Sequence, residues 1–143
     1  MLRILFLLLF TFHAYSMNVI PLTLVQSDNA MQLNLSSPIG VPVKSKATVG
    51  KVNRKNIPSN LININLFIIG ADRLSYKWLE AHQKELKSMQ ALGFITNVND
   101  FKTIVALQDK FKLPVLPVNV DPLLDFVHEH HYPLIIAEGA LWQ

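Results

Sequence analysis

Apolar positions in the second half of the chain recur with two periods, one typical of strands and one typical of helices. Residues 61–70 alternate and then become apolar on both sides, which predicts a central strand that helices cover on both faces. Asp72 is a favourable N-cap, so a helix is predicted over residues 73–91, before a stop signal at Gly93. The helical spacing predicts one buried stripe, made of Leu74, Trp78, Leu79, His82, Leu86 and Met89.

Strands and helices continue to alternate beyond this first helix. Residues 94–98 predict a second strand, and Asp100 predicts the cap of a helix over residues 101–112. The buried stripe predicted for this helix consists of Phe101, Ile104, Val105, Gln108 and Phe111, with Leu107 beside it. Strands and helices that alternate in this way predict an α/β fold with a mostly parallel sheet.

Prolines mark the last predicted elements. Residues 113–120 predict a strand that sits at the edge of the sheet or begins late, because Pro114 and Pro117 cannot both donate hydrogen bonds to a central ladder. Asp121-Pro122 predicts the N-cap and first position of a short helix that extends to His130. Residues 134–137 predict the final strand, after which Gly139 turns the chain.

Residues 17–60 show no sustained period. Residues 18–25 predict a short strand at a sheet edge, and residues 31–35 predict a strand that pairs back on it. Residues 36–60 are interrupted by proline and glycine and predict an irregular basic segment with Lys44, Lys46, Lys51, Arg54 and Lys55. These charges suggest either a patch for nucleic acid or anionic lipid, or a solvated loop. The loop is favoured because no aromatic residue is interleaved to stack on bases.

The first sixteen residues have the three parts of a secretory signal peptide, with Arg3 at the start, an apolar run, and small residues before a cleavage point after Ser16. An uncleaved membrane anchor is the alternative, but the run is shorter than the roughly 20 residues that span a bilayer. We therefore expect a cleaved, exported chain that does not span the membrane, located in the periplasm. The expected divisions are residues 1–16, 17–60 and 61–143.

Composition excludes several classes of function. The chain of 143 residues has no cysteine, which rules out disulfides, thiolate metal sites and thiol catalysis. A net charge of +3 is too small to indicate nucleic-acid binding by itself. No Gly-x-Ser-x-Gly motif, phosphate-binding glycine loop or close carboxylate pair occurs. Neither an enzymatic activity nor a cofactor or small-molecule substrate is expected.

The histidines near the end of the chain suggest one alternative. On a helix, His128 and His131 could share a face, which would fit a periplasmic metal-binding protein or hydrolase. A metal site needs three or four converging ligands, and only Glu129 and the distant His82 are at hand. A helix end at which histidines meet the negative pole of the helix dipole is therefore the favoured interpretation.

A short helix followed by Tyr132-Pro133 and an apolar strand resembles the thioredoxin-like domains. In that fold the proline is cis and faces the loop that opens the first core helix, here residues 70–75. The resemblance implies a central, mostly parallel sheet with an antiparallel C-terminal strand, flanked by helices and without redox cysteines. It requires Pro133 to lie close to Asp72.

The chain from Leu66 onward also resembles a family of exported proteins encoded on integrating conjugative elements. The matching residues are 66–72, Ser75 with Trp78-Leu79, 92–98, Leu116-Pro117 and 131–136. That family belongs to a type IV secretion apparatus for DNA transfer, and is similar to the thioredoxin-like pilus-assembly proteins of F-type conjugation systems. The resemblance implies a non-enzymatic periplasmic component that assembles with or docks other proteins of the apparatus.

The docking surface that follows from the resemblance is the loop at the start of the first core helix together with the X-Pro loop. Its residues are Asp72, Arg73, Ser75, Tyr132 and Pro133, which would bind an extended segment of a partner by strand addition. A periplasmic adaptor unrelated to conjugation is the remaining alternative.

Overall fold

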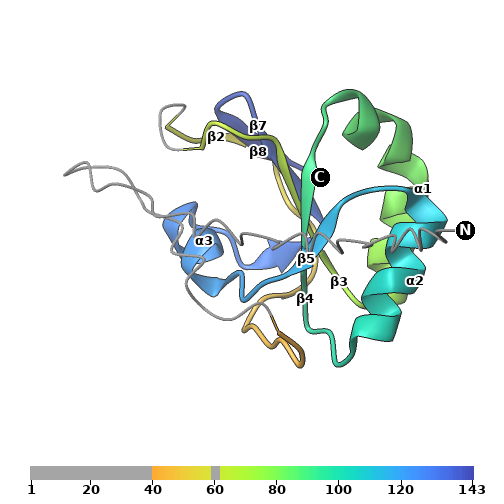
Figure 1. Cartoon of the computed structure of the whole chain (residues 1–143). Helices are drawn as coiled ribbons and strands as arrows, with labels where there is room; N and C mark the ends of the chain where they lie inside the picture. The colour runs from red at the N-terminus through yellow and green to blue at the C-terminus, as the bar shows by residue number, and fades with distance from the viewer. Residues whose placement is uncertain (1–39, 59–61) are drawn as a thin grey trace, which may run out of the picture.

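A six-stranded sheet with helices on both faces forms the centre of the protein, as the computed structural model shows (Figure 1). The structure describes residues 40–58 and 62–143. Its strands are β1 (Thr48–Val49), β2 (Lys55–Asn56), β3 (Leu66–Gly70), β4 (Leu92–Thr96), β5 (Val115–Pro117), β6 (His131–Tyr132), β7 (Leu134–Ala137) and β8 (Ala140–Trp142). Its helices are α1 (Arg73–Ser88), α2 (Phe101–Phe111) and α3 (Asp121–Phe126).

The six-stranded sheet has the order β2-β8-β7-β3-β4-β5 and is mixed. The pairs β3–β4 and β4–β5 are parallel, whereas β7 is antiparallel to β3, β8 to β7 and β2 to β8. The expected antiparallel C-terminal strand and the edge position of the proline-containing strand are confirmed. The expectation of a mostly parallel sheet is wrong, because β2 and β8 extend the antiparallel side.

Strand β8 was missed because its turn carries a weak sequence signal. Glu138 and Gly139 both have positive φ, 51° and 72°, which lets a two-residue loop join β7 to β8. Such turns favour asparagine or aspartate before glycine, and glutamate is not a residue that predicts one.

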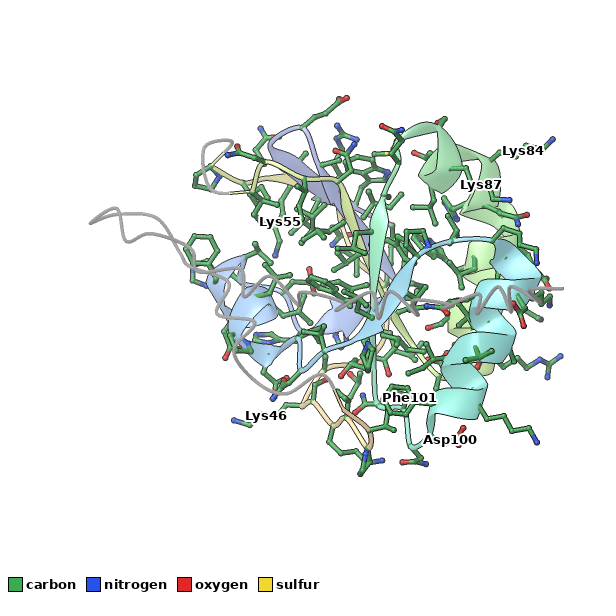
Figure 2. All side chains as sticks on the ribbon, viewed as in Figure 1. Lys46, Lys55, Lys84, Lys87, Asp100 and Phe101 are labelled. Atoms are coloured by element: carbon green, nitrogen blue, oxygen red, sulfur yellow. The ribbon has the colours of Figure 1, made fainter. Side chains whose placement is uncertain are left out.

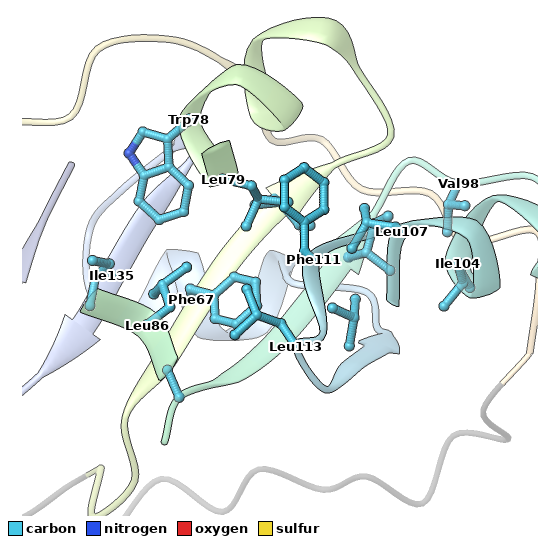
Figure 3. Close-up of a cluster of buried hydrophobic side chains, with 14 of the residues drawn as sticks. Phe67, Trp78, Leu79, Leu86, Val98, Ile104, Leu107, Phe111, Leu113 and Ile135 are labelled. Carbon is cyan, nitrogen blue, oxygen red and sulfur yellow. The ribbon is translucent and has the colours of Figure 1, made fainter. Parts of the chain in front are cut away.

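Two apolar clusters cover the two faces of β3 and β4, which confirms the prediction of a central strand buried on both sides. On one face, Trp78 and Leu79 of α1 and Leu107 and Phe111 of α2 gather with Phe67 of β3 (Figure 3). On the other face, the core consists of Leu66, Ile68, Phe94, Leu123, Leu124, Val127, Leu134, Ile136 and neighbouring apolar residues. Helix α3 packs on this second face (Figure 1).

The buried stripes of the two long helices differ from the prediction. Leu74 of α1 is 57% exposed, and Phe101 and Val105 of α2 are each 52% exposed. The buried residues are Ser75, Trp78, Leu79 and Leu86 on α1, and Ile104, Leu107 and Phe111 on α2. Each helix therefore leaves apolar side chains on its outer surface close to its first turn.

Several predicted boundaries shift by a few residues. Residues 62–65 are not part of strand β3, and Ile64 is exposed. Helix α1 ends at Ser88 and not at residue 91, because Gln90 adopts a positive φ of 52° and the amide of Ala91 bonds the carbonyl of Leu86. Helix α3 ends at Phe126, well before the predicted end at residue 130.

The predicted N-cap role of Asp121 is wrong. The N-cap of α3 is Val120, which makes no side-chain capping bond, and Asp121 lies in the first turn. The Asp121 carboxylate instead accepts a hydrogen bond from the backbone N–H of Lys46, at 2.8 Å. This contact ties the basic segment to α3, a long-range partner that local sequence does not reveal.

The basic segment is mostly irregular, as predicted, but it supplies two short strands. Strand β1 pairs with β6 in a separate two-stranded sheet, and β2 pairs with β8 at the edge of the six-stranded sheet. The charges of the basic segment do not form one patch, because Lys46 and Lys55 lie far apart on the molecule (Figure 2). Lys44 bonds Asn99, Lys55 pairs with Glu129, and the Arg54 guanidinium lies 5.0 Å from the centre of the Trp142 ring.

The predictions for the first part of the chain fall outside the described residues. They are the signal peptide at residues 1–16 and the two strands at residues 18–25 and 31–35. Within residues 40–58 and 62–143, no helix is both long enough and apolar enough to cross a membrane.

Gly93 packs closely against the ring of Phe67, which gives a prediction. A Cβ at this position would meet three ring carbons of Phe67 within 3.0 Å. We expect Gly93→Ala to lower the free energy of unfolding by about 1–3 kcal/mol, because a methyl group overpacks the core. Urea denaturation measures this loss.

A smaller ring partner should relieve the clash. We expect the double variant Gly93→Ala/Phe67→Leu to lose less stability than the sum of the two single variants, with a coupling of about 0.5–3 kcal/mol. Strict additivity of the two losses would contradict this packing.

Candidate functional site

Gly70, the last residue of β3, allows an unusually close approach of two side chains. A Cβ at this position would lie 2.5 Å from Asp72 Oδ2, from Tyr132 Cε2 and from the Tyr132 hydroxyl oxygen. Only glycine fits there, and its missing side chain lets the Asp72 carboxylate and the Tyr132 ring meet. The Tyr132–Pro133 peptide bond is cis, and Pro133 is buried. The structure thus brings Tyr132 of the X-Pro loop to the start of α1, as the thioredoxin-like resemblance implies.

Asp72 and Ser75 form a closed hydrogen-bonded pair at the N-terminus of α1. Asp72 Oδ1 accepts from the Ser75 N–H at 2.8 Å, which confirms the predicted N-cap. The Ser75 hydroxyl donates to Asp72 Oδ2 at 2.9 Å and accepts from the Gly70 N–H at 3.0 Å. Ser75 is fully buried, so its hydroxyl fixes the loop and is not presented to solvent. The spacing of the pair is that of a Cys-x-x-Cys motif at a helix start.

Tyr132 fills the space above Gly70. Its side chain is buried, and its hydroxyl oxygen accepts a hydrogen bond from Asn97 Nδ2 at 3.3 Å. Burial raises the pKa of Tyr132, and the nearby Asp72 charge raises this pKa further, against the opposing effect of the Asn97 hydrogen bond. The phenol therefore stays neutral at physiological pH and keeps its proton as a donor.

Asn97 links this group to the basic segment, and sequence reasoning did not identify it as a site residue. Its side-chain oxygen accepts from the backbone N–H of Ser45 at 3.0 Å, and its Nδ2 donates to the carbonyl of Ala47 at 3.1 Å. Asn97 has a positive φ of 52°, a conformation that asparagine adopts more readily than most residues. Its position directly after a buried strand was the sequence feature that could have indicated Asn97 as a site residue.

Strand β1 of the basic segment lies alongside β6 in parallel, with Thr48 opposite His131 and Val49 opposite Tyr132. The N–H of Gly50 donates to the carbonyl of Tyr132 at 3.0 Å. The backbone edge that a partner strand would use beside Pro133 is thus paired with the chain's own segment. This pairing leaves the exposed side chains around the start of α1 as the accessible part of the predicted surface.

Arg73 and Leu74 are those exposed side chains. Both follow Asp72 directly in the first turn of α1 and are exposed to solvent. Of the five predicted site residues, Asp72, Ser75, Tyr132 and Pro133 therefore form a buried or half-buried frame, and Arg73 projects from it. Leu74, which was expected in the core, joins Arg73 on the surface.

The histidines do not form the helical pair that the sequence suggested. Helix α3 ends at Phe126, so His128 and His131 both lie beyond it. His131 belongs to β6, where its Nδ1 lies 3.1 Å from the Thr48 hydroxyl, whereas His128 is exposed. Within the part of the chain that the structure describes, no three His, Asp or Glu side chains are grouped as a metal site requires.

Comparison with known proteins gives one match. Residues 18–141 match the profile of DUF2859, described as a protein of unknown function. The chain belongs to the DUF2859 family. No match was found among curated proteins or among solved structures. The family match includes every residue of the frame described above, together with the segment that precedes Gly40.

Glu129 gives a test of how the X-Pro region of this DUF2859 protein is held. Its Oε1 accepts from the backbone N–H groups of His130 and His131, and its Oε2 pairs with Lys55 at 3.3 Å. Burial raises the pKa of Glu129, but these hydrogen bonds outweigh that effect and leave the pKa below its ordinary value of 4.5.

A carboxyl with a lowered folded-state pKa stabilises the protein above its unfolded pKa, and the contribution is lost as pH falls through the folded pKa. We expect Glu129→Gln to be less stable than wild type at pH 7, and the difference to shrink at about pH 3. Urea denaturation at both pH values measures this. A difference that stays constant with pH would contradict the assignment.

Proposed function

We propose that this protein is a thioredoxin-like scaffold that has lost redox chemistry and serves as a docking component. The proposal is supported by the mixed sheet with helices on both faces and by the position of Tyr132 beside Gly70 and Asp72 at the start of α1. Asp72 and Ser75 occupy the two positions at which a redox relative would carry its cysteines. Since the chain has no cysteine, thiol–disulfide exchange cannot occur there.

The observation that carries a docking role is the closed hydrogen bonding of the frame. The polar groups of the Asp72–Ser75 pair are engaged within the protein, since the Ser75 hydroxyl donates to Asp72 and accepts from the Gly70 N–H. A rigid frame of this kind holds the first turn of α1 in place. Arg73 and Leu74 project from that turn and supply a cation beside an apolar side chain, a combination suited to contact with another protein.

The partners we propose are proteins of a conjugative transfer apparatus. Support comes from the sequence resemblance to exported proteins of integrating conjugative elements, carried by Ser75 with Trp78-Leu79 and by His131-Tyr132-Pro133. In this account the mature protein acts in the periplasm, without an enzymatic activity. Fold analogy alone does not give function, so the proposal depends on tests of the surface itself.

The surface test uses two exposed positions and a matched control. We expect Arg73→Glu and Leu74→Ser each to lower conjugative transfer by about tenfold, which corresponds to a loss of about 1.4 kcal/mol of binding free energy. Lys84→Glu changes the charge of an exposed residue farther along α1 and should leave transfer unchanged. Transfer frequency is measured in donors that carry each variant in place of the wild-type gene.

A second control separates docking from stability. Asp100 caps α2 through the Thr103 N–H in the same way that Asp72 caps α1. We expect Asp72→Ala to reduce transfer more than Asp100→Ala at equal periplasmic protein levels. Equal transfer in wild type, Arg73→Glu and Asp72→Ala strains would rule out this surface. An adaptor unrelated to conjugation would show normal transfer in every strain.

The thioredoxin-like geometry has a direct chemical test. We expect the double variant Asp72→Cys/Ser75→Cys to form an intramolecular disulfide in air, because residues at this spacing at a helix start are within bonding distance in Cys-x-x-Cys proteins. The helix N-terminus should also lower the pKa of one thiol below the ordinary value of about 8.5. Thiol titration before and after reduction measures both effects, and two thiols that stay free after oxidation would contradict the geometry.

A further inference from the structure

A pocket of about 250 Å³ lies where helices α1 and α2 end. The two helices run in the same direction along one face of the sheet (Figure 1), and Lys87 lies close to the end of α1 (Figure 2). The Gly93 N–H donates to the carbonyl of Pro114 at 2.8 Å, so the chain that follows α1 and the chain that follows α2 lie side by side there. The Arg73–Leu74 surface is at the opposite end of α1, and the pocket is therefore separate from it.

The floor of this pocket is apolar and belongs to the core. Leu86, Ala91 and Leu113 line it and are each at most 3% exposed, and Pro114 completes the lining. The volume is below the roughly 300–1,000 Å³ of sites for drug-sized ligands. It suits a single apolar side chain, which gains free energy when it leaves water for such a floor.

Three polar side chains surround the floor, and each of them is a hydrogen-bond donor. They are the ammonium groups of Lys87 and Lys112 and the amide of Gln90, and all three residues are exposed. Neither lysine forms an ion pair with another described residue. Among the described residues that line the pocket, none carries a carboxylate. The rim therefore offers two positive charges to an anionic group.

The last carbonyls of the two helices are bonded by other groups. Lysine near a helix C-terminus can donate to these carbonyls. Here the Phe111 carbonyl accepts from Gln83 Nε2 at 2.6 Å, and the Leu86 carbonyl accepts from the Ala91 N–H at 3.0 Å. The ammonium groups of the two pocket lysines are not needed for this purpose.

The backbone at the rim gives a second observation. Gln90 and Lys112 have positive φ, 52° and 53°. Glycine is the usual residue in this conformation at a helix end, since a side chain is strained there. Backbone strain of this kind is concentrated at functional sites. Two long polar side chains are thus held at the pocket in positions where glycine would be less strained.

Two other kinds of ligand fit this pocket less well. Single-stranded nucleic acid stacks its bases on aromatic side chains, and no aromatic residue is among the described residues that line the pocket. Recognition of anionic membranes uses clusters of about four to eight Lys or Arg, whereas two lysines line the pocket. A polypeptide with an apolar side chain between acidic ones matches an apolar floor with two ammonium groups on its rim.

We propose that this pocket binds an acidic segment of another protein. One apolar side chain of that segment occupies the floor, and flanking Asp or Glu carboxylates pair with Lys87 and Lys112. Gln90 donates to the backbone or a side chain of the same segment. The inference does not rest on the proposed role in conjugative transfer, because the pocket is at the other end of α1 and its binding is measured directly.

A peptide titration tests the location of binding. The probe is acetyl-Asp-Glu-Leu-Glu-Asp-amide, added to the isotope-labelled full-length chain while backbone amide chemical shifts are recorded. We expect the largest shift changes at residues 86–91 and 112–114. The same peptide with alanine in place of leucine should bind about tenfold more weakly, because less apolar surface leaves water. The largest changes elsewhere, or no change at all, would overturn the proposal.

Charge variants test the role of the two lysines. We expect Lys87→Glu/Lys112→Glu to weaken binding of the leucine peptide at least about tenfold, because both ion pairs become repulsions. Lys77→Glu/Lys102→Glu makes the same change of net charge at exposed positions nearer the starts of the two helices, and should leave binding unchanged. An equal loss in both double variants would overturn the proposal, since binding would then depend on net charge alone.

Glycine at position 112 separates binding from folding. Lys112→Gly relieves the positive φ, so we expect a urea midpoint equal to or above that of wild type together with weaker peptide binding. A lower midpoint with unchanged binding would assign Lys112 a structural role and overturn the proposal. Binding to phosphatidylglycerol vesicles without binding to the peptide would overturn it in favour of a membrane surface.

Discussion

The close approach at Gly70 is the constraint on which the rest of the site depends. Because Gly70 has no side chain, the Asp72 carboxylate and the Tyr132 ring can occupy the space next to its Cα. Tyr132 then reaches Asn97, and Asn97 in turn binds the backbone of the basic segment at Ser45 and Ala47. Three parts of the chain that are distant in sequence thus meet at the carboxyl ends of β3 and β4. Any side chain at position 70 would separate them.

Under the thioredoxin-like assignment that we propose, this arrangement explains how the protein serves without thiol chemistry. In a redox member, the helix start carries a thiolate that the helix N-terminus stabilises. Here the Asp72 side chain accepts a hydrogen bond from the Ser75 N–H, so this N–H group at the helix start fixes the loop. The hydroxyl of Ser75 is buried and bonded on both sides. In this proposal the Asp72–Ser75 pair has a structural role, and the surface of the first turn of α1 is what the site exposes to solvent.

The sequence predicted the parts of the fold that local physics determines. The N-caps at Asp72 and Asp100, the burial of residues 66–69 on both sides and the edge position of the strand with Pro117 all depend on neighbouring residues. Long-range contacts account for the errors. Asp121 binds the distant Lys46 N–H instead of capping α3, and β1 and β2 form because partner strands near the end of the chain are present.

The candidate site was also predictable only in part, because some of its contacts are local and others join distant parts of the chain. Asp72, Ser75, Tyr132 and Pro133 were named through the thioredoxin-like resemblance, and the structure places Asp72, Ser75 and Tyr132 together around Gly70. The exposure of Leu74 could not be read from helical spacing, because the stripe was assumed to begin with the first apolar residue. Ser75, a polar residue, takes the buried position in that turn since its hydroxyl is satisfied by Asp72 and Gly70.

We propose that this protein acts in a DNA-transfer apparatus through contacts with other proteins. The most direct measurement is the transfer frequency of the host element after deletion of this gene, with growth of the same cells measured in parallel. If the protein acts in DNA transfer, we expect transfer to be lost while growth stays normal. We also expect the wild-type gene supplied in trans to restore transfer. Unchanged transfer in the deletion strain would contradict the proposed role in DNA transfer, and the description of the fold would still hold.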